Sequence, residues 1–316
     1  MINVFYKSEG KIKKNNSLKT LRKIPADHII WIDLLAPREE DIKSIEDHYS
    51  LRIQTRAEAE EIESSSRYYE TEEKIMANSN FLIRKEDGYR NEIVSFVVKN
   101  KVLISYRSSY LKSFNDTIRK LEFYSNSSFN CFDILISIFE IRIDEDADMI
   151  EYLARDISNL GKSITIKRNL NEEVIINITK YQDFAMMIRE NIIDKQRVIS
   201  GILKSQYFPQ ANYPKLRVMI KDIGSLLEYT TFSFERLEYL QNTFLGLIDL
   251  EQNKTIKIFT VVTVIFAPPT LVASLYGMNF DFMPELNWRF GYPLALGLMF
   301  ISALITLFYF RRKKWL

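Results

Sequence analysis

Residues 258–280 read IFTVVTVIFAPPTLVASLYGMNF, residues 291–310 read GYPLALGLMFISALITLFYF, and neither stretch contains a charged residue. Only DFMPELNWRF, residues 281–290, separates them. A helix needs about 20 apolar residues to cross a hydrocarbon core of ~30 Å. The two stretches therefore predict a two-pass membrane hairpin, with Gly277-Met278-Asn279 at the mouth of its turn.

The remainder of the chain has the composition of a soluble body. The 316 residues are 27% charged, and the mean hydropathy is −0.14, too polar for a protein made mostly of membrane helices. The chain has 43 basic and 41 acidic residues, so we expect no nucleic-acid partner. The N-terminus lacks an apolar segment, and we therefore expect no signal peptide.

Cysteine and histidine are too scarce for several kinds of site. Cys131 is the only cysteine, which excludes an intramolecular disulfide and a thiolate metal cluster. His28 and His48 are the only histidines, too few for a histidine-rich metal centre. We expect both to be ordinary surface or partly buried residues.

Basic residues flank the hairpin on its outer ends. Lys254 and Lys257 precede the first apolar stretch, residues 311–314 read RRKK after the second, and Arg289 is the only basic residue of the turn. The positive-inside rule then places both termini in the cytosol. We expect the protein to lie in the inner or plasma membrane. A cytosolic protein held by a hairpin anchor satisfies the same pattern.

Periodicity and turn signals divide the chain into three parts. We expect an α+β domain over residues 1–128 (a mixed sheet with flanking helices), a helical stalk region over residues 129–254, and the hairpin with its basic tail over residues 255–316. The predicted strands are 4–6, 29–32, 74–83, 92–98 and 102–106, with a hairpin turn at 99–101. The predicted helices are 38–49, 110–124, 131–160 and 175–203.

A heptad-like series of residues follows Pro214. Steps of four and three residues pass almost entirely through apolar side chains, which predicts a packed helix seam. The seam is Leu216, Ile220, Ile223, Leu227, Thr230, Phe234, Leu237, Gln241, Phe244 and Ile248. No proline interrupts the pattern before Pro268, so we expect one very long helix that runs from about Lys215 into the first membrane span.

Small and hydroxyl residues form a stripe along that span. At about 100° per residue, the hydroxyl residues of the span fall within an arc of roughly 80°, and Ala267 lies in the same arc. This polar stripe is Thr260, Thr263, Ala267, Thr270 and Ser274, and it continues toward the cytosol near Ile256, Asn253, Asp249 and Asn242. Such a stripe faces either another helix, as packing glue, or water. Two spans cannot enclose water, so a pore requires a ring of several chains.

Asn279 would form a ring of amides at the outer end of the stripe. Neutral amide oxygens suit hydrated magnesium, which keeps most of its waters. Gly277 is expected to end the helix as a C-terminal cap. Ile256 and Phe259 lie near the cytosolic end, where apolar rings can gate a pore by dewetting. Pro268-Pro269 predicts a kink.

The hairpin sequence resembles the CorA family of magnesium channels. The similarity covers Tyr276-Gly277-Met278-Asn279-Phe280, Met283-Pro284-Glu285-Leu286, Trp288, Gly291-Tyr292-Pro293 and the basic end Lys313-Lys314-Trp315-Leu316. The resemblance implies a ring-shaped homopentamer that passes Mg2+, and also Co2+ and Ni2+, by gated passive influx. It implies an entrance at Gly277, Met278 and Asn279. It also implies a pore line of Ser274, Thr270, Ala267, Thr263, Phe259, Ile256 and Asn253.

The sequence departs from the family pattern in places. Ala267 stands where relatives often have a bulkier Met, Pro269 follows the usual Pro268, and Asn242 stands where relatives often have an Asp. The resemblance also implies regulatory Mg2+ between subunits. The candidate ligands are Asp222, Glu70, Glu72 and Glu73, and Val218 and Lys221 occupy stalk positions where carboxylates were expected. Residues 144–148, DEDAD, are expected to be a solvated face.

Two other functions remain open at this point. A related carrier would prefer Zn2+ or Co2+, and a hairpin-anchored cytosolic sensor or scaffold would carry no ion. An enzyme is the least expected class, because no nucleophile–base set, phosphate loop or histidine metal centre is found in the sequence.

Overall fold

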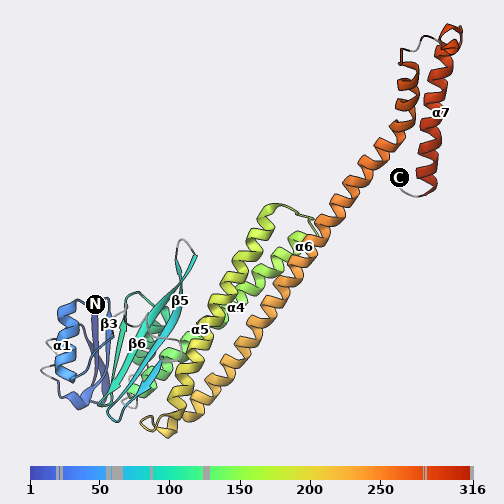
Figure 1. The fold of residues 1–316 in the computed structure, drawn as a ribbon. Coiled ribbons are helices and arrows are strands. Elements are labelled where there is room, and N and C mark those ends of the chain that lie inside the picture. The colour runs from blue at the N-terminus through green and yellow to red at the C-terminus, as the bar shows by residue number, and fades with distance from the viewer. Residues whose placement is uncertain are drawn as a thin grey trace. The chain divides into compact units, whose positions relative to one another are not determined.

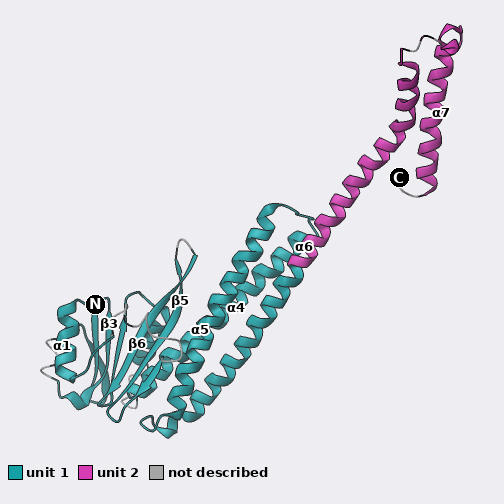
Figure 2. Ribbon diagram, viewed as in Figure 1, with its two compact units in different colours: residues 1–240 teal, residues 241–316 magenta. Residues whose placement is uncertain are grey.

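The computed structural model describes residues 1–18, 21, 24–54, 58, 67–85, 88–123, 129–279, 281 and 283–313 (Figure 1). The chain divides into two compact units, Met1–Leu240 and Gln241–Leu316 (Figure 2). Phe280 of the hairpin motif and Lys314-Trp315-Leu316 of the basic tail lie outside the described residues.

The first unit begins with a seven-stranded mixed sheet. Its strand order is β2-β1-β3-β7-β6-β5-β4. Only β3 and β7 pair in parallel, and every other neighbouring pair is antiparallel. The strands are β1 (Ile2–Ser8), β2 (Lys11–Asn15), β3 (Ile29–Leu35), β4 (Tyr68–Glu70), β5 (Lys74–Lys85), β6 (Gly88–Lys99) and β7 (Val102–Arg107).

The five strands predicted from the sequence are confirmed, and two strands were missed. β2 has the sequence KIKKN with no buried residue, and β4 has only three residues. Both lie at the sheet edges, where short and charged strands limit pairing with other chains. The predicted turn at 99–101 is present, with Asn100 and Lys101 at positive φ between the paired residues Lys99 and Val102.

Each face of the sheet carries its own apolar core. On one face, Ile45 and Tyr49 of α1 (Glu39–Tyr49) join a buried cluster with Ile32, Val97 and Ile104. On the other face, aromatic rings meet in a second core. Its rings are Phe5, Trp31, Phe81, Phe96, Phe114 and Phe139, with centroid distances of 4.7–6.3 Å.

Helices follow the sheet to the end of the chain. They are α3 (Lys112–Phe123), α4 (Cys131–Thr165), α5 (Glu172–Lys204), α6 (Tyr213–Tyr276) and α7 (Gly291–Arg312). The short 3-10 turns are η2 (Ala26–His28), which precedes β3, and η4 (Gln210–Asn212) and η5 (Pro284–Asn287), which lie between the later helices. The predicted helices are confirmed, although Tyr124, the last residue of one of them, is outside the described residues. Asn130 caps α4 by accepting hydrogen bonds from the backbone N–H groups of Phe132 and Asp133.

The very long helix expected after Pro214 is confirmed, because α6 is continuous over 64 residues with Pro268 and Pro269 inside it. Its predicted seam was only half right. The buried positions are Leu216, Met219, Ile223, Leu226, Thr230, Ser233, Leu237, Leu240 and Phe244. Four predicted residues were therefore one position too late along the chain. These residues, which are only half-buried, are Ile220, Leu227, Phe234 and Gln241.

The contacts of α6 inside the first unit explain the register. Nη1 of Arg189 on α5 donates to Oγ1 of Thr231 at 2.8 Å and to Oγ1 of Thr230 at 3.4 Å. A methyl group of Leu240 on α6 lies 3.2 Å from the position that a Cβ on Gly161 of α4 would take. The polar residue Ser233 can be buried in the seam because its hydroxyl donates to the carbonyl of Tyr229 at 2.9 Å.

The second unit contains two helices that are long and apolar enough to cross a membrane. They are the C-terminal part of α6 and the helix α7, with mean hydropathies of 2.0 and 2.1 in their most apolar windows. Only 6% and 11% of those windows are buried, unlike the core helices of a soluble protein. Figure 1 shows the end of α6 and α7 side by side and antiparallel, as expected for a hairpin.

Candidate functional site

The polar stripe and its extension stand free on the end of α6. Every residue of the predicted pore line is exposed: Asn253, Ile256, Phe259, Thr263, Ala267, Thr270 and Ser274. Thr260, Thr263 and Thr270 each donate their hydroxyl proton to the carbonyl four residues earlier, at 2.8–2.9 Å. The helix therefore satisfies these protons, while hydroxyl lone pairs remain as acceptors on its surface.

A different face of α6 is covered within the second unit. Its buried or half-buried residues between positions 255 and 276 are Val261, Ile265, Pro268, Pro269, Val272 and Tyr276. At about 100° per residue, this face lies about 170° from the centre of the predicted pore line. α7 is the neighbouring helix in this unit, and it buries Gly291, Ala295 and Phe310. The hairpin thus leaves the polar stripe without a partner from the described part of its own chain.

The Gly-Met-Asn motif directly follows the last residue of α6. The N–H of Gly277 donates to the carbonyl of Ala273 at 3.0 Å, and that of Met278 donates to Leu275 at 3.4 Å, so the last turn tightens and stops. Gly277 ends the helix, as expected, and it does so without a positive φ. A Cβ at Gly277 would lie 3.1 Å from the oxygen of Ala273, so close approach to this carbonyl favours glycine. Met278 and Asn279 are exposed.

A short, closely packed turn links the two membrane helices. η5 is closed by the N–H of Leu286 to the carbonyl of Met283 and by that of Trp288 to the carbonyl of Glu285. A Cβ at Gly291 would lie only 2.1 Å from the oxygen of Glu285, so the backbone passes where no side chain fits. Asp281 and Glu285 are exposed, and they place two carboxylates in the same turn as Asn279.

The four candidate regulatory ligands have different surroundings. Asp222 and Glu72 are exposed. Glu73 is exposed, and its carboxylate lies 3.5 Å from the ammonium of Lys99. Within the described residues, no group of three or more Asp, Glu, His or Cys side chains could hold a metal ion.

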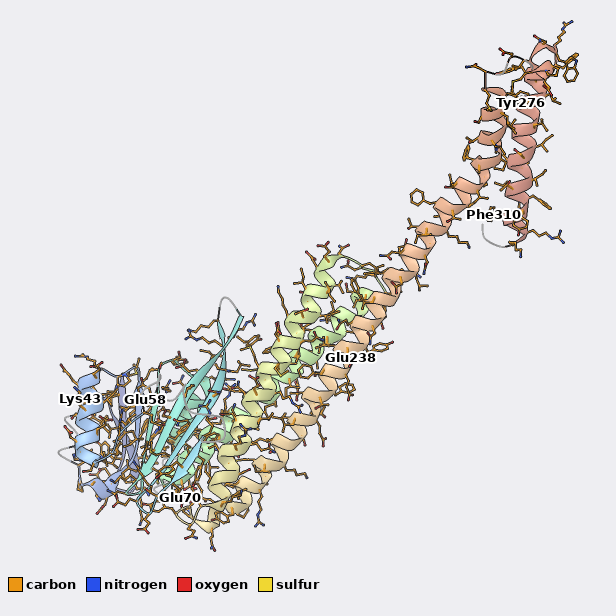
Figure 3. All side chains as sticks on the ribbon, viewed as in Figure 1. Lys43, Glu58, Glu70, Glu238, Tyr276 and Phe310 are labelled. Carbon is orange, nitrogen blue, oxygen red and sulfur yellow. The ribbon has the colours of Figure 1, made fainter. Side chains whose placement is uncertain are left out.

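Glu70 has a structural role within its own chain. Its Oε1 accepts hydrogen bonds from Ser205 Oγ at 2.9 Å and from the N–H of Tyr207 at 3.2 Å, and its Oε2 accepts one from Tyr68 at 2.6 Å. The carboxylate thereby ties β4 to the loop that joins α5 and α6. Figure 3 labels Glu70 at the first unit.

The acidic run 144–148 is not simply a solvated face, as the sequence had suggested. Asp146 is 1% exposed, with the ammonium of Lys195 3.0 Å from its Oδ2 and Nη2 of Arg142 2.5 Å from its Oδ1. Asp144 is exposed, and its pKa is raised by partial burial and by the nearby carboxylates of Glu140, Asp148 and Asp222. The stalk residue Asp222 therefore adds to an acidic surface formed mainly by α4.

Sequence reasoning missed a buried ionic network between the sheet and the helices. Lys195 on α5 is fully buried, and its ammonium donates to the carbonyls of Asn80 and Asn191 as well as facing Asp146. The preceding residue, Asp194, accepts hydrogen bonds from Ser79 Oγ at 3.0 Å and the N–H of Asn80 at 2.7 Å. Burial lowers the pKa of Lys195, and the carboxylate of Asp146 opposes that shift.

Comparison with known proteins identifies the family. The model of a family described as "CorA-like Mg2+ transporter protein" matches residues 26–312. The chain is a member of the CorA family. The magnesium transport protein CorA of Wolinella succinogenes is 40% identical over 322 residues, covering all of both chains. That of Helicobacter pylori (strain 26695) is 32% identical over 320 residues, again with full coverage of both chains.

Solved structures confirm the CorA fold. The complete structure of the CorA magnesium transporter from Methanocaldococcus jannaschii aligns with a TM-score of 0.86 and 18% identity, and covers 100% of this chain and 99% of that one. The full-length CmaX protein aligns with a TM-score of 0.77 and 15% identity, with 100% and 98% coverage. This CorA-family chain is accordingly an integral membrane protein with an α+β domain, a very long helix and a membrane hairpin.

Proposed function

We propose that this CorA-family protein is a channel for gated, passive influx of hydrated Mg2+. The observation that carries the proposal is the uncovered polar stripe, because α7 occupies the opposite face of α6. A row of hydroxyl and small residues that points away from the only other span requires partners outside the chain. Copies of the same helix around an axis would bring the stripes together around water.

The proposed path runs from the motif inward along α6. Gly277, Met278 and Asn279 form the entrance, and Ser274, Thr270, Ala267, Thr263, Phe259, Ile256 and Asn253 line the path. Hydroxyl and amide oxygens accept hydrogen bonds from the waters around the ion, so the ion need not be dehydrated. Ile256 and Phe259 supply an apolar constriction that closes by dewetting.

The assembly is proposed to be a homopentamer, following the resemblance to the family. The hairpin is proposed to lie in the inner or plasma membrane. Both termini would then lie in the cytosol, in line with the basic residues outside the hairpin. Residues 1–128, 129–254 and 255–316 form the sheet domain, the stalk region and the membrane hairpin. Mg2+ is the proposed transported ion, and Co2+ and Ni2+ are carried too. Mg2+ is also the proposed regulator, with the candidate ligands Asp222, Glu70, Glu72 and Glu73.

Flux into liposomes tests the proposal against its alternatives. Reconstituted protein is expected to admit Mg2+ to an encapsulated indicator, with Co2+ and Ni2+ also entering. A preference for Zn2+ or Co2+ over Mg2+ would instead indicate the related carrier. Absence of flux from correctly assembled protein would indicate a hairpin-anchored sensor or scaffold.

The motif itself has a matched control in the same turn. Asn279→Ala is expected to reduce Mg2+ flux at least tenfold and leave assembly intact, because the entrance loses the amides that accept hydrogen bonds from the hydrated ion. Asn287→Ala removes an equally exposed amide from η5 and is expected to leave flux within twofold of wild type. Equal fluxes for the two variants would contradict the role of Asn279.

A further inference from the structure

A cavity in the first unit lies outside the proposed ion path. It has a volume of about 430 Å3, within the range of small-molecule sites, and it is bordered by the β5–β6 hairpin, the start of α3 and the middle of α4. The residues that decide its chemistry are Arg84, Tyr89, Tyr110, Lys112, Glu145 and Tyr152. Nothing in the transport proposal uses this cavity.

Three tyrosines give the cavity flat aromatic walls. Tyr89 stacks on Phe184 of α5, with ring centroids 3.7 Å apart and planes at 16°, so the orientation of its ring is held. Tyr152 lies under the guanidinium of Arg84, 5.9 Å from the ring centroid. Tyr110 is 69% exposed at the rim, unusually open for such a large ring. Aromatic faces of this kind accept a planar ring of a ligand by stacking.

The rim favours a negatively charged group. Arg84 and Lys112 are both exposed, and neither forms an ion pair among the described residues. Lys112 is also the first residue of α3, a 12-residue helix with no acidic residue in its first turn. The positive end of the helix dipole therefore adds to the two cations. Asp148 is the one exposed carboxylate of the lining, so the rim has two cations against one anion.

The inner wall presents polar atoms without partners. Oε2 of Glu145 accepts a hydrogen bond from Nη1 of Arg142 at 3.0 Å, but its Oε1 is buried and has no partner among the residues that the structure describes. Nε of Arg142, a side chain 2% exposed, is also buried without a partner. A buried polar atom left unpaired costs about 1–3 kcal/mol, so a ligand that supplies the missing donor or acceptor is favoured.

These features together select one class of ligand. We propose that the cavity binds a nucleoside phosphate, with its base between the tyrosines, an N–H of the base donating to Oε1 of Glu145, and its phosphate at Arg84 and Lys112. Inorganic phosphate alone would leave the aromatic walls and Glu145 unused. An organic cation would meet Arg84 and Lys112 with the same charge.

Calorimetric titration of the full-length protein in detergent tests this site. AMP, GMP, CMP and UMP, each without metal, serve as probes, and at least one is expected to bind saturably with one site per chain. The matching nucleoside and inorganic phosphate are each expected to bind at least tenfold more weakly. Absence of saturable binding by all four would overturn the proposal, as would inorganic phosphate binding as tightly as the best nucleotide.

Two double variants on the same surface separate this site from general charge attraction. Arg84→Gln with Lys112→Gln is expected to weaken nucleotide binding at least tenfold. Arg119→Gln with Lys120→Gln removes two cations from α3 outside the cavity lining, and the affinity is expected to remain within twofold. Equal weakening by both pairs would overturn the site, and so would no weakening by the first. Liposome flux is independent of these titrations, so failure here would leave the channel proposal standing.

Discussion

At the scale of single residues, charge burial gives the first unit its most sensitive positions. Asp33 on β3 and Arg107 on β7 are both almost completely buried, and two hydrogen bonds of 3.0 and 2.8 Å join them. Ser105 Oγ also donates to Oδ1 of Asp33, at 3.1 Å, while accepting from Trp31 Nε1 at 2.9 Å. These contacts lock the only parallel strand pair of the sheet.

Asp33→Ala is expected to destabilise the protein by about 3–5 kcal/mol, because Arg107 would remain buried without its counter-charge. Asp116→Ala, which removes a carboxylate facing the exposed Arg119, is the control and is expected to cost no more than about 1 kcal/mol. Denaturant unfolding in detergent, followed by tryptophan fluorescence, measures both. Similar unfolding midpoints for the two variants would contradict the proposed contribution of the Asp33–Arg107 pair to stability.

The lone cysteine offers a test of burial. Desolvation raises the pKa of the Cys131 thiol to about 12. At pH 8 the thiolate fraction is then on the order of one in 10,000, so native protein is expected not to react with Ellman's reagent within an hour. Unfolding in guanidinium should release one reactive thiol per chain. Rapid reaction of the native protein would show that the start of α4 is open.

At the scale of helices and strands, the periodicity of the sequence predicts that a helix forms better than it predicts which of its residues are buried. Sequence spacing located α6 and the start of its seam at Leu216, yet it chose Ile220, Leu227 and Phe234 over the buried Met219, Leu226 and Ser233. Both sets are compatible with a helix face, and the buried set includes the polar residue Ser233. Its hydroxyl is satisfied by the carbonyl of Tyr229, which composition alone does not reveal.

Edge strands and buried ions escaped prediction for related reasons. β2 carries three lysines in five residues, so no apolar alternation marks it as a strand. Lys195 and Asp146 look like surface charges in the sequence and become partners only when α4 and α5 pack on β5. The polar stripe was visible in advance because it depends on one helix alone, whereas the cavity near Tyr110 is assembled from three segments of the chain.

The turn between the membrane helices has a glycine that the packing requires. In Gly291→Ala the new Cβ would meet the carbonyl oxygen of Glu285 at 2.1 Å, so η5, which lies in the same turn as Asn279, must move. We expect reduced Mg2+ flux and lower thermal stability. Gly297→Ala in the same helix has nothing within 4 Å of the new Cβ and should match wild type in both assays. Wild-type flux and stability in Gly291→Ala would show that the turn yields without consequence.

At the scale of the whole molecule, family membership and the hairpin geometry support the same account. The CorA-family match covers residues 26–312, so the hairpin and the sheet domain from β3 onward belong to the match. Within the hairpin, one face of α6 is covered and the polar face is open. We therefore propose that copies of the chain form a ring that closes the polar faces around a water-filled path.

The most direct test is the pattern of block along α6 during Mg2+ flux. In a Cys131→Ser background, Thr270→Cys and Ser274→Cys lie on the polar stripe, and Val272→Cys lies on the covered face between them. A cationic thiosulfonate reagent is added to liposomes that contain each variant. Mg2+ flux is expected to fall at least tenfold at positions 270 and 274 and to stay within twofold at 272. Block at 272 without block at 270 and 274 would contradict it.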